Sequence, residues 1–235
     1  MTPAPVLVIG GSRGTGLLIA RLLLQHGKAV RVLARDPIAA GSRLGSSGDI
    51  VRGDLTDPES LASAMRGVAH IVFTAGVRSG RLVRERTVRR IEFEGMLNTI
   101  EATRASGFTG RFLYMNSSGT GSRSFWARAL NFYKGNTLEW RARAEAAIRN
   151  SQLAYAIIRT GVLLNSRGGR HEIGLTQKPL PLSPKYRIAR ADVAEVFAAA
   201  LDHPKVVRTT FEIAWQGRPE LRWRDALDTL KPDSA

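Results

Sequence analysis

The sequence predicts an α/β fold, a doubly wound parallel sheet of the Rossmann type, from three observations. Short apolar runs of strand length alternate with stretches of helical periodicity along the chain. The first run, Val6–Ile9, is continuously apolar, as a parallel strand buried on both faces should be. A glycine-rich turn, residues 10–16, follows it and leads into a helical stretch. We therefore expect a single domain over residues 1–235, with helices on both faces of the sheet and a small substrate-side region near the C-terminus.

Boundaries follow from capping and breaking residues. Asp36 before Pro37, and Thr56 three residues before Glu59, have the spacing of helix starts. Residues 165–187 carry Gly, Pro and Ser without periodicity, so they form either a loop beside a binding cleft or an ordinary surface insertion. Further helices are expected over Leu17–Leu24 (ended by Gly27) and over residues 87–106, 136–150 and 192–201. Strands are expected at Val6–Ile9, Val30–Ala34, Asp49–Val51, His70–Thr74, Arg111–Met115, Tyr155–Arg159 and Thr210–Ile213.

The chain is strongly basic and has no cysteine. Its 235 residues include 35 Lys and Arg against 20 Asp and Glu, a net charge of +15, and 29 of the basic residues are Arg. The lack of cysteine excludes disulfides, thiolate metal sites and a cysteine nucleophile, and it fits a cytoplasmic location. Neither a signal peptide nor the ~20-residue apolar run of a membrane helix is expected. The charge suits an anionic ligand or partner, or reflects composition bias alone.

The glycine-rich turn has the arrangement of a dinucleotide-binding site. Gly10, Gly14 and Gly16 stand between a predicted strand and a predicted helix, with Ser12, Arg13 and Thr15 among them. Glycine lets the backbone approach a pyrophosphate closely, and the start of the helix offers free N–H groups.

Several motifs extend this pattern along the chain, and together they resemble the short-chain dehydrogenase/reductase superfamily. The resemblance is to its atypical branch of NAD(P)H-binding proteins, similar to NmrA-like regulators and to biliverdin and flavin reductases. The motifs, in chain order, are Val8–Gly16, Gly53–Asp57, Phe93–Gly95 with Asn98, Met115–Ser118, Ile158–Gly161 and Ala191–Ala194. The resemblance implies that Asp54 and Leu55 flank an adenine, that Ala75 and Gly76 pass its ribose, and that Thr160 to Val162 approach the nicotinamide.

The end of the second strand predicts which dinucleotide is bound. A site that prefers NAD places a carboxylate there, about 20 residues past the glycines, and this chain has Arg35. A guanidinium suits a 2′-phosphate through charge-assisted bonds, and Arg13 and, more weakly, Arg43 are candidates for the same phosphate. Asp36 is interpreted as a helix cap. We therefore predict NADP(H) as the cofactor.

The resemblance also raises the question of a catalytic Ser, Tyr and Lys. Ser117 or Ser118 supplies the serine, but Thr137 and Arg141 occupy the Tyr and Lys positions. Threonine is a poor general acid, and arginine is too basic to shuttle a proton, although it can hold a ribose or phosphate. Tyr133 is a further candidate if the segment before it bends into the cleft. We therefore expect Ser117, Tyr133 and Arg141 as catalytic residues, and no metal site.

Three functions stay open at this point. The first is an oxidoreductase that transfers hydride from NADPH to a small carbonyl, quinone or flavin-like acceptor. The second is a non-catalytic NADP(H)-binding sensor or accessory subunit that docks an acidic partner protein. The third is an isomerase or dehydratase that keeps the dinucleotide bound. Specific nucleic-acid binding is not expected, because the basic segment lacks interleaved aromatic residues. The docking surface would use Arg78, Arg81, Arg84, Arg86, Arg89 and Arg90, which otherwise form a solvated helix face. His171 is the one histidine we place near a substrate.

Overall fold

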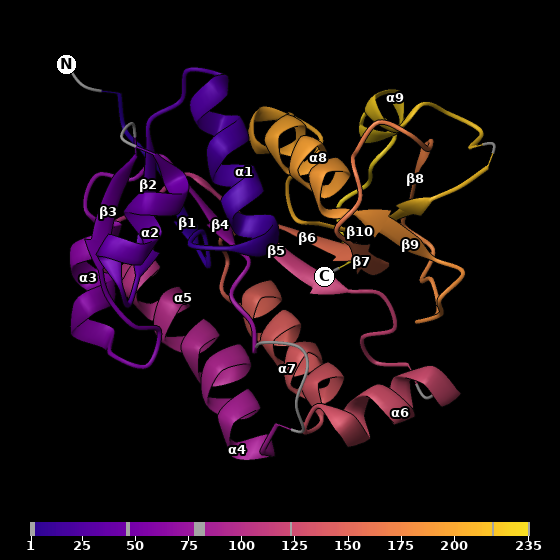
Figure 1. Ribbon diagram of the computed structural model, residues 1–235, viewed down its shortest axis with the longest axis horizontal. Coiled ribbons are helices and arrows are strands. Elements are labelled where there is room, and N and C mark those ends of the chain that lie inside the picture. Colours follow the sequence, from indigo (N-terminus) through magenta and orange to yellow (C-terminus); the bar gives the residue numbers. More distant parts are fainter. Residues whose placement is uncertain (1–2, 46–47, 78–82, 123, 218, 235) are drawn as a thin grey trace.

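The computed structural model describes residues 3–45, 48–77, 83–122, 124–217 and 219–234, and its centre is a sheet of eight strands (Figure 1). The strand order is β3-β2-β1-β4-β5-β6-β10-β8, and β8 alone among these pairs antiparallel to its neighbour. A parallel pair, β7–β9, forms a second small sheet. The strands are β1 Val6–Ile9, β2 Val30–Ala34, β3 Asp49–Arg52, β4 His70–Phe73, β5 Arg111–Ser117, β6 Ala154–Thr160, β7 Val162–Leu164, β8 Ile173–Thr176, β9 Arg187–Ala189 and β10 Thr209–Trp215.

Helices cover both faces of this sheet, as the sequence predicts (Figure 1). The alternation of β1 shows why: Val6 and Val8 pack with α1, α2 and α8, whereas Leu7 and Ile9 pack with α3, α5 and α7. All four side chains are buried, so a continuously apolar strand feeds two separate cores. The helices are α1 Gly14–Gln25, α2 Pro37–Leu44, α3 Pro58–Met65, α4 Glu85–Val88, the π-helical segment η1 Arg89–Glu94, α5 Gly95–Ala105, α6 Phe125–Tyr133, α7 Thr137–Asn150, α8 Arg190–Asp202 and α9 Trp223–Leu227.

Three details of the sequence prediction are wrong. The expected helix over residues 87–106 is divided, because η1 inserts a wider π-type turn between α4 and α5. The cap of α3 is Asp57, whose carboxylate accepts from the N–H of Glu59, while Thr56 bonds to Asp54 instead. Residues 165–187 are not one irregular loop, since they contain β8, which adds to the sheet edge beside β10. Asp36 does cap α2, accepting from the N–H of Ala39 at 3.0 Å.

The sheet order places a crevice between the two halves. From β1 the chain winds outward through β2 and β3, then returns to the other side of β1 with β4 and continues to β5 and β6. The connections that leave the carboxyl ends of β1 and β4 therefore diverge, and ligands of doubly wound sheets bind in the opening that this leaves.

Candidate functional site

A cleft of about 1800 Å³ opens at the carboxyl ends of β1, β2, β4, β5 and β6. The residues that the sequence suggested for cofactor binding and catalysis all lie on its wall, although they come from positions 10 to 162 of the chain. They are Gly10, Ser12, Arg13, Gly14, Thr15, Gly16, Arg35, Asp54, Leu55, Ala75, Gly76, Ser117, Tyr133, Arg141, Thr160 and Val162. The fold therefore gathers the predicted set in one place.

The glycine-rich turn is packed so closely that Gly16 must lack a side chain. A Cβ on Gly16 would lie 2.4 Å from the Gly10 carbonyl oxygen and 2.4 Å from Thr74 Oγ1. Thr74 Oγ1 in turn donates to the carbonyl of Ile9 at 3.1 Å, which ties the end of β4 to the end of β1. The first turn of α1 is thus held directly over the sheet edge, with its N–H groups at the cleft, as a bound diphosphate requires. These residues fit a dinucleotide.

The far end of the cleft, beyond β2, is rich in arginine. Arg35 follows β2, and Arg13 and Arg43 line the same wall. The carboxylate of Asp36 is engaged in capping α2, so it is turned to the helix backbone. Partial burial raises the pKa of Asp54, but hydrogen bonds from Thr56 and the charges of Arg35 and Arg90 outweigh burial and hold that pKa below its ordinary value. The cleft lining here therefore combines three arginines with the carboxylates of Asp36 and Asp54.

Thr137 and Arg141, which stand at the positions of the expected Tyr and Lys, both bond to the buried carboxylate of Glu92. Thr137 Oγ1 donates to Glu92 Oε2 at 2.5 Å, and Arg141 Nε donates to the same oxygen at 2.9 Å. Glu92 Oε1 accepts from the N–H of Val77 at 2.9 Å, which fixes the segment after β4. Burial would raise the pKa of Glu92, but Arg141 and the hydrogen bonds prevail and lower it; Glu92 conversely raises the pKa of Arg141. Both groups are therefore charged near neutral pH, and neither is a proton shuttle.

Gly76 lies against this ion pair. A Cβ there would lie 2.9 Å from Arg141 Nη2 and 3.2 Å from Glu92 Oε1. The resemblance suggested bare backbone at this position to pass a ribose; in the structure a side chain here would also press on the Arg141 guanidinium. Sequence reasoning did not single out Glu92, whose only signal was an acid between two apolar residues, Ile91 and Phe93, within a predicted helix.

The end of β5 presents Ser117 to the cleft above a buried polar network. Asn116 donates to Glu145, and Ser118 donates to Glu212 at 2.5 Å, so the two flanking side chains point into the protein. Arg159 on β6 joins both acids, at 2.6 Å to Glu145 and 3.4 Å to Glu212. The Oγ of Ser117 itself donates to the carbonyl of Ser118 at 3.1 Å and lines the cleft. Of the two candidate serines, Ser117 therefore faces the site.

Helix α6, which the sequence analysis did not predict, forms the wall opposite the phosphate loop. Trp126 and Tyr133 are seven residues apart on one side of it and line the cleft, with 51% and 61% of their surfaces exposed. Tyr133 therefore lies at the cleft, and its catalytic role stays a prediction. The ring of Tyr133 packs edge-on against Phe132, with centroids 5.6 Å apart.

The arginine segment is partly engaged within the chain. Arg89 pairs with Glu94 at 2.8 Å and lies over the indole of Trp140, and Arg90 donates to Thr56 Oγ1 at 3.1 Å. Arg84 and Arg86 flank the start of α4. The remaining two members, Arg78 and Arg81, lie outside the described residues.

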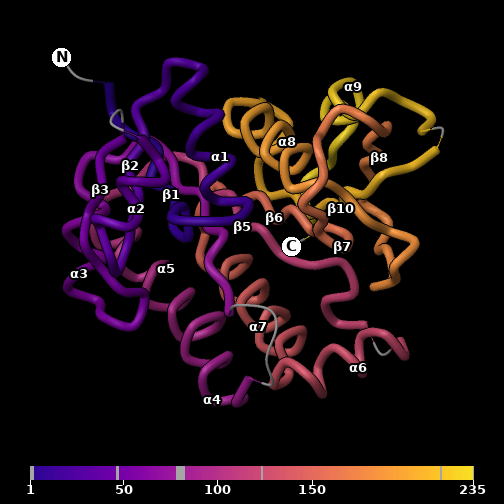
Figure 2. Tube along the Cα trace, viewed as in Figure 1, coloured from indigo at the N-terminus to yellow at the C-terminus, as the bar shows by residue number. Residues whose placement is uncertain are grey.

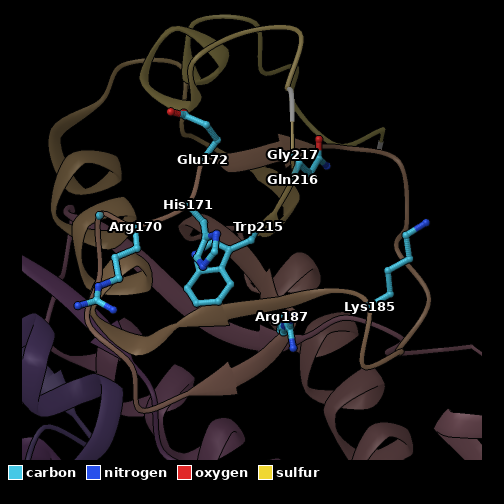
Figure 3. Close-up of a pocket in the computed structure, with 9 residues that line it drawn as sticks. Arg170, His171, Glu172, Lys185, Arg187, Trp215, Gln216 and Gly217 are labelled. Carbon is cyan, nitrogen blue, oxygen red and sulfur yellow. The ribbon is translucent and has the colours of Figure 1, made fainter.

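His171 lies in a separate pocket of about 470 Å³ and does not line the cleft. Figure 3 shows its ring against the indole of Trp215, and the two centroids are 4.2 Å apart. The Trp215 Nε1 group donates to Asp192 at 2.7 Å, which fixes the indole. The placement of His171 near a substrate is therefore not supported by its contacts. In the part of the chain that the structure describes, no helix is both long enough and apolar enough to cross a membrane.

Comparisons with known proteins agree with this geometry. Sanguinarine reductase from Eschscholzia californica is 29% identical over 92% of this chain and 89% of its own length. Among solved structures, a putative NAD-dependent epimerase/dehydratase from Bacillus halodurans has a TM-score of 0.79 and 24% identity, covering 97% of this chain and 100% of that one. ChuY, an anaerobillin reductase from Escherichia coli O157:H7, has a TM-score of 0.76 and 22% identity, covering 93% of this chain and 98% of that one. The model of the NAD(P)H-binding family matches residues 10–204, and the chain therefore belongs to that family.

Proposed function

We propose that this protein is an NADPH-dependent reductase that acts on a small conjugated acceptor, of the carbonyl, quinone or flavin-like class. The observation that carries the proposal is that the glycine-rich turn and Arg35 line the same cleft. Two relatives that are similar in extent to this chain are named as reductases, sanguinarine reductase and the anaerobillin reductase ChuY. When bound, NADPH supplies a hydride; the chain supplies its binding and orientation.

The preference for NADPH over NADH is supported by charge. Arg35, Arg13 and Arg43 all line the cleft, and Arg43 Nη1 donates to the carbonyl of Ser12, next to Arg13, at 3.5 Å. These cations would neutralise a 2′-phosphate bound at the end of β2. The adjacent carboxylate, Asp36, accepts from the N–H of Ala39 through Oδ1 and so acts as the cap of α2. A site of this composition favours the ligand with the additional phosphate.

The chain's own groups divide the remaining tasks. Ser117 offers a hydroxyl at the end of β5, where it can orient the acceptor or the nicotinamide amide. Arg141, held by Glu92, contributes a fixed guanidinium beside Gly76 on the cleft wall, and in this role it stands where the Tyr-dependent enzymes have a ribose-holding lysine. Tyr133 borders the acceptor side, and its exposure leaves it in contact with water as a proton source. Trp126 and Tyr133 present flat apolar surface to a conjugated ring.

The experiment is a scan of quinones, flavins and conjugated carbonyls for NADPH oxidation, followed by Ser117→Ala on the best acceptor. We expect kcat/KM to fall about tenfold or more, because one orienting hydrogen bond is lost. An unchanged Kd for NADPH would assign that bond to the acceptor, and a weaker one would assign it to the nicotinamide amide. Ser118→Ala is the matched control, because that hydroxyl points away from the cleft to Glu212. Equal losses of kcat/KM in the two variants would mean that Ser117 has no specific role and that any change at the end of β5 impairs activity.

A second function, a non-catalytic NADP(H) sensor, is favoured by one observation. Thr137 and Arg141 are committed to Glu92, so the proton-transfer pair of the Tyr-dependent relatives is replaced by a structural one. NADPH binding without turnover on any acceptor in the scan would favour this function over the reductase.

A further inference from the structure

The side chain of Arg190 reaches from the start of α8 into the phosphate-loop end of the cleft. Its Nη1 donates to Thr15 Oγ1 at 3.0 Å, and its Nε donates to Asn165 Oδ1 at 2.9 Å. Thr15 belongs to the glycine-rich turn and Asn165 follows β7, so one guanidinium bridges the N-terminal and C-terminal walls of the cleft. Arg190 also lines the cleft itself.

Arg190 differs in its partners from three other partly buried arginines. Arg141, Arg149 and Arg159 each pair with a buried glutamate. Within the described ranges, Arg190 bonds only to a hydroxyl and an amide oxygen, both neutral. Burial lowers the pKa of Arg190, and no carboxylate of the described residues raises it again. A partly desolvated cation with neutral partners is stabilised when an anion binds beside it.

The nearest acid in the sequence is held elsewhere. Asp192, two residues further along α8, accepts from the N–H of Gly169 at 2.7 Å and from Trp215 Nε1 at 2.7 Å. The first turn of α1 likewise contains no acidic residue. The positive charge of Arg190 is therefore left facing the phosphate-loop end of the cleft.

The placement of α8 explains how the guanidinium arrives there. Helices α1 and α8 pack side by side on the same face of the sheet, as both views show (Figures 1 and 2). Each begins at the cleft, α1 with Gly14 and α8 with Arg190. The guanidinium thus lies beside the first turn of α1, whose free N–H groups face an anion in such sites.

We propose that Arg190 binds the diphosphate of the dinucleotide and so adds a side-chain cation to the backbone cradle of residues 10–16. The proposal rests on the proposed function, because it assumes that the cleft takes a dinucleotide. It assigns Arg190 and Arg35 to different phosphates of one ligand: Arg190 to the diphosphate, which NADPH and NADH share, and Arg35 to the 2′-phosphate, which NADPH alone carries.

The test is calorimetric titration of NADPH, NADH, ADP-ribose and adenosine 2′-monophosphate into the wild type and Arg190→Met. Loss of a charged hydrogen bond predicts about 10- to 100-fold weaker binding of NADPH, NADH and ADP-ribose, which all carry the diphosphate. Binding of adenosine 2′-monophosphate, which lacks it, should stay within about twofold, a readout that a general distortion of the cleft would not spare. Arg187→Met is the matched control, because Arg187 is three residues earlier and lines the small pocket instead.

Each other result counts against the proposal in a distinct way. If Arg190→Met binds all four ligands as Arg187→Met does, or weakens all four equally, Arg190 is no diphosphate ligand, while the proposed function stands on the wild-type titration. If the wild type binds none of the dinucleotides, the proposed function and this inference fall together. Should Arg190→Met not fold, Arg190→Lys is the second variant, because it keeps the charge but lacks the guanidinium's paired N–H donors. We expect Arg190→Lys to fold and to bind the diphosphate ligands with intermediate affinity. Wild-type affinity in Arg190→Lys would overturn the proposed contact.

Discussion

At the scale of single residues, the site depends on close approaches that only small or charged side chains allow. Gly16 and Gly76 lie where a Cβ would meet backbone or a guanidinium at under 3 Å. The need for Gly16 could be predicted from the sequence, because the turn between strand and helix has few solutions. The close approach of Arg141 to Gly76 could not be predicted, because Arg141 is 65 positions away and its place is set by the packing of α7.

Gly16→Ala should disrupt the phosphate loop. The added methyl would lie 2.4 Å from the Gly10 carbonyl oxygen, so α1 must move away from β1. We expect a loss of about 1–3 kcal/mol in the free energy of unfolding, as for other overpacked sites, together with much weaker NADPH binding. Gly41→Ala, where the nearest atom is 3.4 Å away in the middle of α2, should be neutral or slightly stabilising. Urea unfolding and calorimetry measure both effects; an unperturbed Gly16→Ala protein would refute the close-packing argument.

At the scale of elements, η1 is the segment that the sequence could not predict. Residues 87–106 have helical periodicity throughout, and nothing local marks the π-type turn. The turn coincides with the buried Glu92, whose partners on α7 and after β4 are remote in sequence. The strands, by contrast, were predicted to within one or two residues for β1 to β6, since buried parallel strands are short apolar runs bounded by turns. The short strands β7, β8 and β9 were missed because their pairing, not their composition, makes them strands.

Glu92→Gln should loosen α7 and the segment after β4 together. Breaking a buried ion pair by removing one partner costs about 3–5 kcal/mol, because Arg141 is left uncompensated. Glu94→Gln, on the same segment, should cost about 1 kcal/mol or less, since its pair with Arg89 is half exposed. Thermal or urea unfolding compares the two, and equal small losses would mean that Glu92 holds neither element.

The same carboxylate should make stability depend on acid pH. The folded-state pKa of Glu92 lies below its ordinary value of 4.5, so its contribution is fully present above pH 4.5 and is lost as the pH falls through the folded pKa. Between pH 6 and pH 3, the wild type should therefore lose more stability than Glu92→Gln does. Parallel acid-dependence curves for the two proteins would contradict this assignment.

At the scale of the whole molecule, the fold brings residues that are far apart in the sequence together in one cationic cleft. The residues on its wall run from Ile9 to Arg190 and come from both halves of the sheet on either side of the β1–β4 junction. The fold class, the location of the cleft and the Arg35 end could be predicted from strand order and motif spacing. The aromatic wall of α6 and the bridge made by Arg190 could not, because they arise where segments remote in sequence meet. Part of the net charge of +15 is thus concentrated where a phosphorylated ligand would bind.

The most direct test of the account is calorimetric titration of NADPH and NADH into the wild type, Arg35→Met and Arg52→Met. Arg52 ends the neighbouring strand β3 and does not line the cleft, so it controls for loss of charge alone. The account predicts tighter binding of NADPH than of NADH in the wild type and in Arg52→Met, and a preference reduced about 10- to 100-fold in Arg35→Met with NADH affinity little changed. An unchanged NADPH-to-NADH ratio in Arg35→Met, or no dinucleotide binding by the wild type, would contradict it.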